Sequence, residues 1–425
     1  MVSVSPSEPG SGACVSEFKR GSLFLGSMFV SAAFAHASPS KTAYDKARPM
    51  VGIFLFSACI RIEYTLLFKS IFMGMQRLPI VFLFLIYALN AFGAESSMEN
   101  LLFTGRWDVG NSSAKTSAPA AMVQFDAEAK SLTFELDGDS RWRLDTDGKD
   151  SKFFETHGRM AKEIKGLDGV RHRYRLIKMS ETNPGFVTLF KISTDASGKF
   201  YPKPKASERR IEFIGDSFTV GFGNEGNAAD NPEMVFERTD ASRSYAFLLA
   251  DGFKADFQVN AASGRGLVRN YANIVPEWTL RDLYKYTVPG EAPDNPNATL
   301  YDLNSFHPQV IVIFVGINDF QGEPPYADKK KFMSAYVEFL SMLRKAHPGV
   351  KFLLVSTKVW PNDDLTPTVK KIYEAERDAG HGDVEFVSIL TENTALLGHP
   401  SIHSHVDMAQ NMRQTIGRLG KWLSR

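Results

Sequence analysis

RRIEFIGDSFT, residues 209–219, joins a short apolar run to a serine through a tight turn. The run 211–214 predicts a buried strand, which Gly215 then breaks before a helix can begin. Ser217 should therefore lie at the C-terminal edge of a sheet, beside the backbone N–H groups of a helix N-terminus, which stabilise anions. An acyl-transfer nucleophile requires this geometry, although a serine here can also be a simple helix N-cap.

Three more blocks follow in a definite order. They are SGRG at 263–266, GIND at 316–319 and HPS at 399–401. The second block directly follows a very apolar run, VIVIFV at 310–315, which predicts another buried strand. Each block alone is common in turns, so it is the ordered set that carries the information.

These blocks resemble those of the SGNH (GDSL-type) hydrolases. FIGDS at 213–217, ASGRG at 262–266 with VRN at 268–270, and HPS at 399–401 are similar to carbohydrate esterase family two in particular. The resemblance covers about 101–423. It implies an N-terminal β-sandwich joined to an SGNH domain, and deacetylation of plant-cell-wall polysaccharides. It also implies Ser217 as nucleophile and His399 as general base.

The oxyanion hole implied by this resemblance consists of the Ser217 N–H, the Gly264 N–H and the Asn318 side-chain amide. The alternative for Gly264 and Asn318 is an ordinary turn role. Many SGNH enzymes place an Asp two or three residues before the catalytic His, but Leu396 and Leu397 occupy these positions here.

Another group must therefore orient His399. A backbone carbonyl suffices to fix its tautomer, and the carboxylates of Glu392 and Asp407 are the other possibilities. His403 and His405 follow closely, but no acidic residue or cysteine has matching metal-ligand spacing, so we predict neither a metal nor a cofactor.

Two tryptophans, Trp278 and Trp360, are predicted to stack on the sugar rings of a substrate. The competing interpretation is that both belong to the hydrophobic core.

Residues 75–94 have the features of a secretory signal peptide: a short basic start at Met75, an apolar run and a small-x-small cleavage site at 91–93. We therefore predict that 1–74 is a mis-called, disordered extension and that the protein is secreted or periplasmic. A membrane anchor through 51–60 or 80–89 is the alternative, but both runs are shorter than the roughly 20 residues of a spanning helix. Both cysteines, Cys14 and Cys59, lie upstream of the predicted cleavage site.

The mature part is slightly acidic. Residues 1–94 hold eight of the 49 Lys/Arg and four of the 48 Asp/Glu, which leaves a formal charge of −3. This balance argues against nucleic acid or a stable membrane partner. An acetylated polysaccharide fits it, and the oligomeric state stays open.

The mature chain divides into two domains. Short alternating runs at 121–125, 131–136, 172–177 and 185–192 predict a β-sandwich, a jelly roll, over 98–200. After a Pro- and Lys-rich linker or edge strand at 195–210, strands alternate with helices. This predicts an α/β/α domain with a parallel sheet over 208–425, with strands at 351–356 and 384–389 and a last helix at 402–423.

We therefore expect a secreted serine esterase that removes O-acetyl groups from a polysaccharide through an acetyl-enzyme, and the polysaccharide we expect is hemicellulose. One alternative is another SGNH hydrolase, namely a peptidoglycan O-acetylesterase or a lipid esterase. Another is a carbohydrate-binding protein with weak esterase activity.

Overall fold

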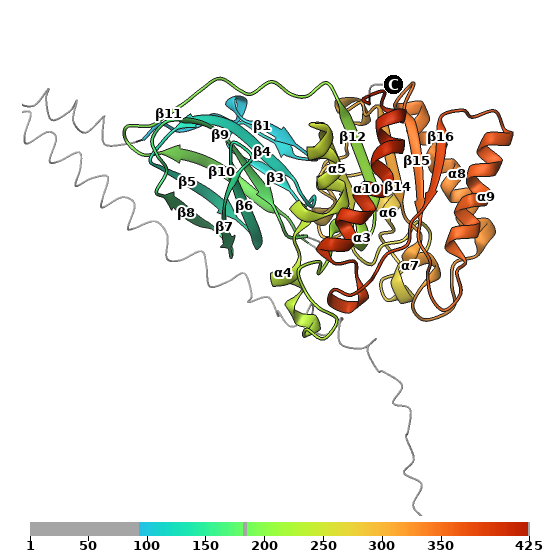
Figure 1. Ribbon diagram of the computed structural model, residues 1–425. Coiled ribbons are helices and arrows are strands. Elements are labelled where there is room, and N and C mark those ends of the chain that lie inside the picture. Colours follow the sequence, from blue (N-terminus) through green and yellow to red (C-terminus); the bar gives the residue numbers. More distant parts are fainter. Residues whose placement is uncertain (1–92, 182–184, 424–425) are drawn as a thin grey trace, which may run out of the picture. The chain divides into compact units, whose positions relative to one another are not determined.

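The computed structural model describes residues 93–181 and 185–423, which form an all-β region followed by an α/β region (Figure 1). The predicted upstream extension and nearly all of the predicted signal peptide lie outside the described residues. Among the helices of the described part, none combines the length and the apolar character needed to cross a membrane.

The N-terminal region is a sandwich of two antiparallel sheets. One has the order β1-β4-β9-β6-β7, with β11 on β4, and the other has the order β2-β3-β10-β5-β8. The strands are β1 (Leu102–Thr104), β2 (Asp108–Val109), β3 (Ala114–Thr116), β4 (Met122–Glu128), β5 (Ser131–Asp137), β6 (Ser140–Thr146), β7 (Asp150–Thr156), β8 (Met160–Lys165), β9 (Arg171–Lys178), β10 (Val187–Thr194) and β11 (Lys199–Phe200).

The pairing of these strands is nested. β6 pairs with β7, β5 with β8, β4 with β9 and β3 with β10. Folding a long hairpin over itself in this way produces a jelly roll, so the predicted fold of this region is confirmed. Alternate side chains of both sheets, including Phe125, Phe134 and Trp142, fill the space between them.

The C-terminal region has a five-stranded parallel sheet in the order β13-β12-β14-β15-β16. Its strands are β12 (Arg210–Gly215), β13 (Asp256–Ala261), β14 (Val310–Phe314), β15 (Lys351–Ser356) and β16 (Val384–Ser388). β12 lies between β13 and β14, so the chain reverses its direction across the sheet beside the end of β12. Ligands of such sheets bind at the carboxyl ends of the strands next to this reversal.

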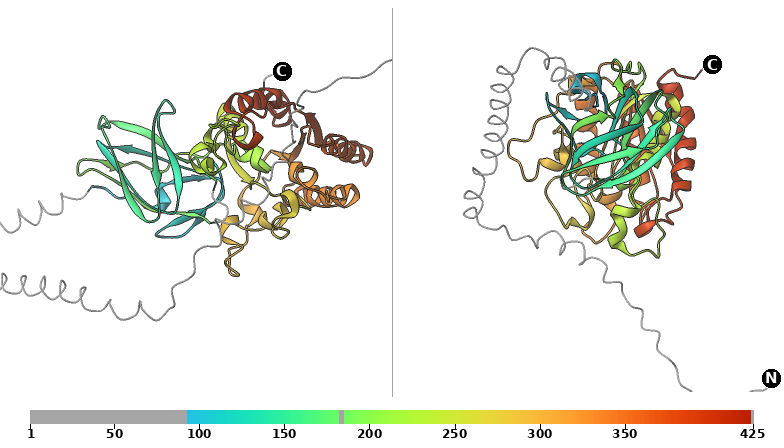
Figure 2. Two further views of the ribbon diagram at one scale, coloured as in Figure 1. Left: turned by 90° about the horizontal axis from the view of Figure 1, so that it is seen from below. Right: turned by 90° about the vertical axis from the view of Figure 1, so that its left-hand side faces the viewer.

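Helices cover both faces of this sheet. α5 and α10 pack against each other on one face, and α8 and α9 pack together on the other (Figures 1 and 2). The helices are α3 (Ser217–Val220), α4 (Val235–Arg238), α5 (Tyr245–Phe253), α6 (Leu280–Leu283), α7 (Ile317–Phe320), α8 (Lys329–Ala346), α9 (Leu365–Asp378) and α10 (Ile402–Leu419). The predicted last helix is too long, because α10 ends at Leu419 with Gly420 as its C-cap, and Trp422 turns back to contact Phe253.

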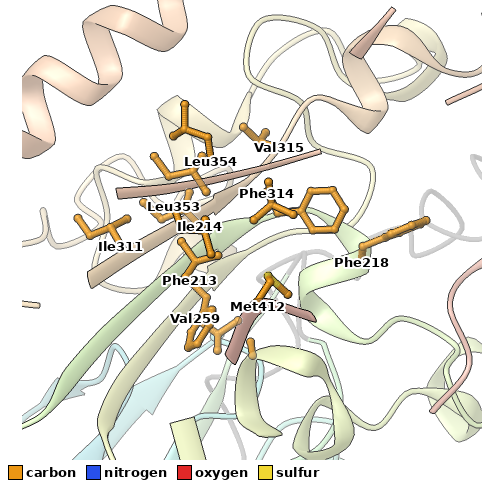
Figure 3. Close-up of a cluster of buried hydrophobic side chains, with 14 of the residues drawn as sticks. Phe213, Ile214, Phe218, Val259, Ile311, Phe314, Val315, Leu353, Leu354 and Met412 are labelled. Atoms are coloured by element: carbon orange, nitrogen blue, oxygen red, sulfur yellow. The ribbon is translucent and has the colours of Figure 1, made fainter. Parts of the chain in front are cut away.

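The core of this domain is continuous across the sheet. Phe213, Ile214, Ile311 and Phe314 come from the two central strands, and Met412 reaches them from α10 (Figure 3). β12 and β14 are buried along almost their whole length, as expected for parallel strands covered on both faces. This rigid centre carries the loops at the strand ends.

A buried arginine joins the two domains. Arg106, from the loop after β1, is 1% exposed and donates to the carbonyls of Tyr284 and Tyr286 at 2.7 and 3.2 Å. Its guanidinium also lies 3.5 Å from the Glu212 carboxylate of β12 and donates to Gln258 of β13 at 3.2 Å. The polar side chains of β13 are therefore buried by the sandwich domain rather than exposed.

We expect Arg106→Leu to lower the free energy of unfolding by about 3 kcal/mol or more, because it leaves the Glu212 carboxylate buried without its cation. Urea denaturation measures this change. The control is Arg171→Leu, which removes a half-exposed partner of Asp126 and should cost about 1 kcal/mol or less. Equal, small losses in both variants would contradict the prediction.

Candidate active site

Three adjacent strands bring the sequence blocks together. In the sheet, Gly215 at the end of β12 pairs with Ala261 of β13 on one side and with Phe314 of β14 on the other. The residues that follow these strand ends are Ser217, Gly264 and Asn318. The parallel register therefore places all three at the same edge of the sheet.

Ser217 is the first residue of α3, and Asp216 is its N-cap. The Asp216 carboxylate accepts a hydrogen bond from the Phe218 N–H at 3.2 Å. Burial raises the pKa of Asp216 to about 8, which reduces the negative charge of this cap beside the serine. Ser217 is thus not the N-cap, which leaves its hydroxyl for another partner.

That partner is His399. Its Nε2 lies 2.9 Å from the Ser217 Oγ, and its Nδ1 lies 3.0 Å from the Leu396 carbonyl oxygen. A carbonyl only accepts hydrogen bonds, so Nδ1 carries the proton and Nε2 is free to accept the serine hydroxyl. The Leu396 carbonyl thus orients the His399 ring, a role that an aspartate has in many SGNH enzymes.

Neither carboxylate alternative contacts the ring. Asp407 is exposed and lies 3.7 Å from the His403 side chain. Glu392 is exposed, and its backbone carbonyl accepts from the Ser404 hydroxyl.

Aromatic rings surround the imidazole. Phe222 and Phe218 have their ring centroids 4.5 and 5.7 Å from that of His399. Burial lowers the pKa of His399 to about 4, and the hydrogen bonds to the carbonyls of Leu396 and Leu397 oppose this change only in part. His399 is therefore neutral at physiological pH, as a general base must be.

Asp319 organises the loop that carries Gly264. Its buried carboxylate accepts hydrogen bonds from three successive N–H groups, those of residues 267, 268 and 269, at 2.8 to 2.9 Å. A Cβ on Gly266 would lie 2.5 Å from this carboxylate, so only glycine permits the approach. Burial raises the pKa of Asp319 to about 6, while the three N–H groups act to lower it. This role of Asp319 was not predicted from the sequence, although Asp319 is the last residue of the GIND block.

Three N–H donors remain available at this edge. Within residues 93–181 and 185–423, the Ser217 and Gly264 N–H groups donate to no other group. Gly264 has φ +74°, a conformation that favours glycine. The Asn318 amide uses one hydrogen for the Arg265 carbonyl at 3.0 Å and keeps the other. Such donors can stabilise an oxyanion.

The remaining candidates lie in other surroundings. His405 is buried, and its Nδ1 accepts from the Tyr245 N–H at 3.2 Å, which ties α10 to the start of α5. Trp360 is 67% exposed, and Trp278 is partly exposed with its ring 6.1 Å from that of Tyr286. Both tryptophans lie outside the hydrophobic cores, so stacking on a sugar stays a prediction.

A surface groove of about 510 Å³ lies on the sandwich domain, along β4 and β9. Its ionisable side chains include Asp126, Arg173 and His172, and none of its lining residues belongs to the serine–histidine cluster.

Both domains of the chain resemble known proteins. Residues 213–405 match the GDSL-like lipase/acylhydrolase family, and residues 103–204 match the carbohydrate esterase 2 N-terminal family. An acetylxylan esterase / glucomannan deacetylase of Cellvibrio japonicus is 33% identical over 282 residues, which are 63% of this chain and 75% of that protein.

Two further comparisons extend the likeness. The cellulase/esterase CelE of Acetivibrio thermocellus is 29% identical over 334 residues, or 76% of this chain, although this chain spans only 40% of that protein. The structure of a family two carbohydrate esterase from Clostridium thermocellum, in complex with cellohexaose, superposes with a TM-score of 0.69 at 28% identity. That match covers 76% of this chain and 100% of the other.

Proposed function

This chain belongs to carbohydrate esterase family two, and from that premise we propose that it removes O-acetyl groups from a plant polysaccharide by Ser217–His399 catalysis. It is a carboxylic ester hydrolase, as its relatives are. The observation that best supports the catalytic assignment is the 2.9 Å contact between the Ser217 Oγ and the His399 Nε2.

The reaction has two halves. As Ser217 attacks the acetyl carbonyl, His399 Nε2 takes the hydroxyl proton, and the oxyanion accepts hydrogen bonds from the Ser217 and Gly264 N–H groups and the Asn318 amide. His399 then protonates the leaving sugar alkoxide. In the second half, His399 activates water, which attacks the acetyl-enzyme and releases acetate and free Ser217.

Two source polymers are suggested by the relatives. The Cellvibrio japonicus protein is named for acetylxylan and for glucomannan, so we propose that a hemicellulose is the substrate. The Clostridium thermocellum esterase binds cellohexaose, which favours a β-1,4-linked backbone and makes carbohydrate binding the second candidate function.

A panel of substrates tests this proposal. Acetate release from acetylated xylan, acetylated glucomannan and O-acetylated peptidoglycan should be measured, with an aryl acetate as the reference and an aryl decanoate as the lipid-like ester. We expect turnover of the aryl acetate and of one or both hemicelluloses. Preferred turnover of peptidoglycan or of the decanoate would assign a different substrate, and binding without any ester turnover would assign a binding role.

We also propose that the protein is exported, because residues 75–94 have the features of a signal peptide. The mature chain should begin at Ala94 or Glu95. Mass spectrometry of the protein from its native host tests this, and a peptide from within 2–41 would contradict it.

The pH profile should reflect the low pKa of His399. Activity requires neutral imidazole and is lost as the pH falls through its pKa, so the acidic limb of kcat/KM for an aryl acetate should lie well below 6.5, toward pH 4. Circular dichroism at each pH verifies that the protein stays folded. A limb at pH 6.5 or above would contradict the prediction. A limb near 6 that disappears in Asp319→Asn would belong to Asp319 instead.

Replacing Asn318 by Ala should reduce kcat about 100- to 1000-fold, because it removes one donor to the oxyanion. The KM for an aryl acetate should change little. Steady-state kinetics measures both constants, and a loss below about tenfold would exclude the amide as a donor to the transition state.

A further inference from the structure

A carboxylate of the sandwich domain reaches the loop that carries Gly264. Glu181 follows β9, and its Oε1 accepts a hydrogen bond from the Ser263 N–H at 2.6 Å. Ser263 directly precedes Gly264, so this bond connects the N-terminal domain to the peptide unit before the proposed oxyanion donor. The two residues are 82 positions apart in the chain.

The segment that presents Glu181 is firmly anchored. The Lys178 side chain is fully buried and donates to the Ser180 carbonyl at 2.6 Å. The Ser180 hydroxyl lies 2.7 Å from the Ser140 hydroxyl, and the Met179 carbonyl accepts from the Ala241 N–H of the hydrolase domain at 2.7 Å. Glu181 thus follows a segment that is hydrogen-bonded to both domains.

The Gly264 peptide is held on its other side as well. The Gly264 carbonyl accepts from the Tyr271 N–H at 2.8 Å, and the Arg265 carbonyl accepts from the Asn318 amide at 3.0 Å. Among the described contacts, Glu181 is the side-chain partner of the residue before Gly264. Without Glu181, the Ser263 N–H loses this hydrogen bond. The peptide before Gly264 is then no longer held in the direction that points the Gly264 N–H.

We propose that Glu181 is a positioning residue for the oxyanion hole, so that the sandwich domain completes the active site of the hydrolase domain. This inference rests on the proposed esterase function. Its physical basis is that an oxyanion donor must be held in place before the reaction, since a displacement of about 1 Å can cost about 100-fold in rate.

The charge of Glu181 is not what the site requires. A negative charge near the oxyanion would oppose its formation, and burial raises the pKa of Glu181, while the neighbouring Lys178 and Arg265 act to lower it. What the loop requires is the hydrogen-bond acceptor. Glutamine keeps this acceptor at the same length and removes the charge.

The test compares Glu181→Ala with Glu181→Gln. We expect Ala to lower kcat for an aryl acetate about 10- to 100-fold with KM within about twofold, and Gln to retain kcat within about threefold. Each rate is divided by the number of active sites, counted by end-point labelling with a fluorophosphonate. The control is Asp251→Ala, which removes a carboxylate from a different contact between the domains, its 2.5 Å ion pair with Arg175.

The outcomes separate the two proposals. If the wild type hydrolyses the ester but Glu181→Ala keeps full kcat for each labelled site, the positioning role is wrong and the esterase function stands. Equal losses in Glu181→Ala and Asp251→Ala would also overturn it, because they would indicate only weakened domain contact. If the wild type itself neither turns over the ester nor reacts with the fluorophosphonate, the proposed function fails, and this inference fails with it.

Discussion

Ser217→Ala should lower kcat for acetate esters by about 10,000-fold or more, the largest loss expected for any single substitution in this protein. The hydroxyl is the atom that forms the acetyl-enzyme, and within the described cluster no other hydroxyl lies against the His399 Nε2. Burst kinetics with an aryl acetate and long-time acetate release from polysaccharide both measure the loss.

The fold should not change in this variant. Asp216, not Ser217, caps α3, so the alanine removes no capping bond. The thermal midpoint should stay within a few degrees of the wild type, and binding of cello- or xylo-oligosaccharides should persist. Turnover near the wild-type rate in a folded Ser217→Ala protein would exclude Ser217 as the nucleophile.

His399→Ala should have the second-largest effect, a loss of about 1000-fold or more in kcat, because one side chain acts as the base and the acid of the cycle. Removing the ring also leaves the Leu396 carbonyl without its side-chain donor. That bond contributes about 1 kcal/mol, which is small beside the kinetic loss.

The matched controls are Glu392→Gln and Asp407→Asn. Both side chains are exposed, and the contacts of the His399 ring nitrogens are with Ser217 and Leu396 instead. Each control should therefore keep kcat within about tenfold, or about 1.4 kcal/mol of barrier. A loss of several orders of magnitude in either control, with the fold unchanged, would show that a carboxylate completes a triad in the working enzyme.

Much of the architecture follows from local pattern. Buried parallel strands are continuous apolar runs, so IEFI before Ser217 and VIVIFV before Asn318 were predicted as strands, and their register brings the blocks to one edge. Turn residues act over a few positions, and Asp- and Gly-rich clusters lie at the turns after β5 and β6.

The local sequence pattern did not predict a strand whose polar side chains are buried by the other domain. β13, with the sequence DFQVNA, was not predicted as a strand, because Gln258 and Asn260 make it look half exposed. In the structure, Arg106 and Glu212 satisfy these amides beneath the sandwich domain. β6, β7 and β8 were also not predicted as strands. Each contains three charged residues, which leave few apolar positions for a period-2 pattern.

Residue patterns were sufficient to predict the two domains and the family, and to select Ser217, Gly264, Asn318 and His399 as the candidate site residues. The orientation of His399 and the contacts of the Gly264 loop became known from the folded structure alone. The Leu396 carbonyl is a backbone atom, which every residue possesses, so no side chain at its position reveals its role. Glu181 acts through a contact between domains, and the spacing of residues along a chain carries no record of such a contact.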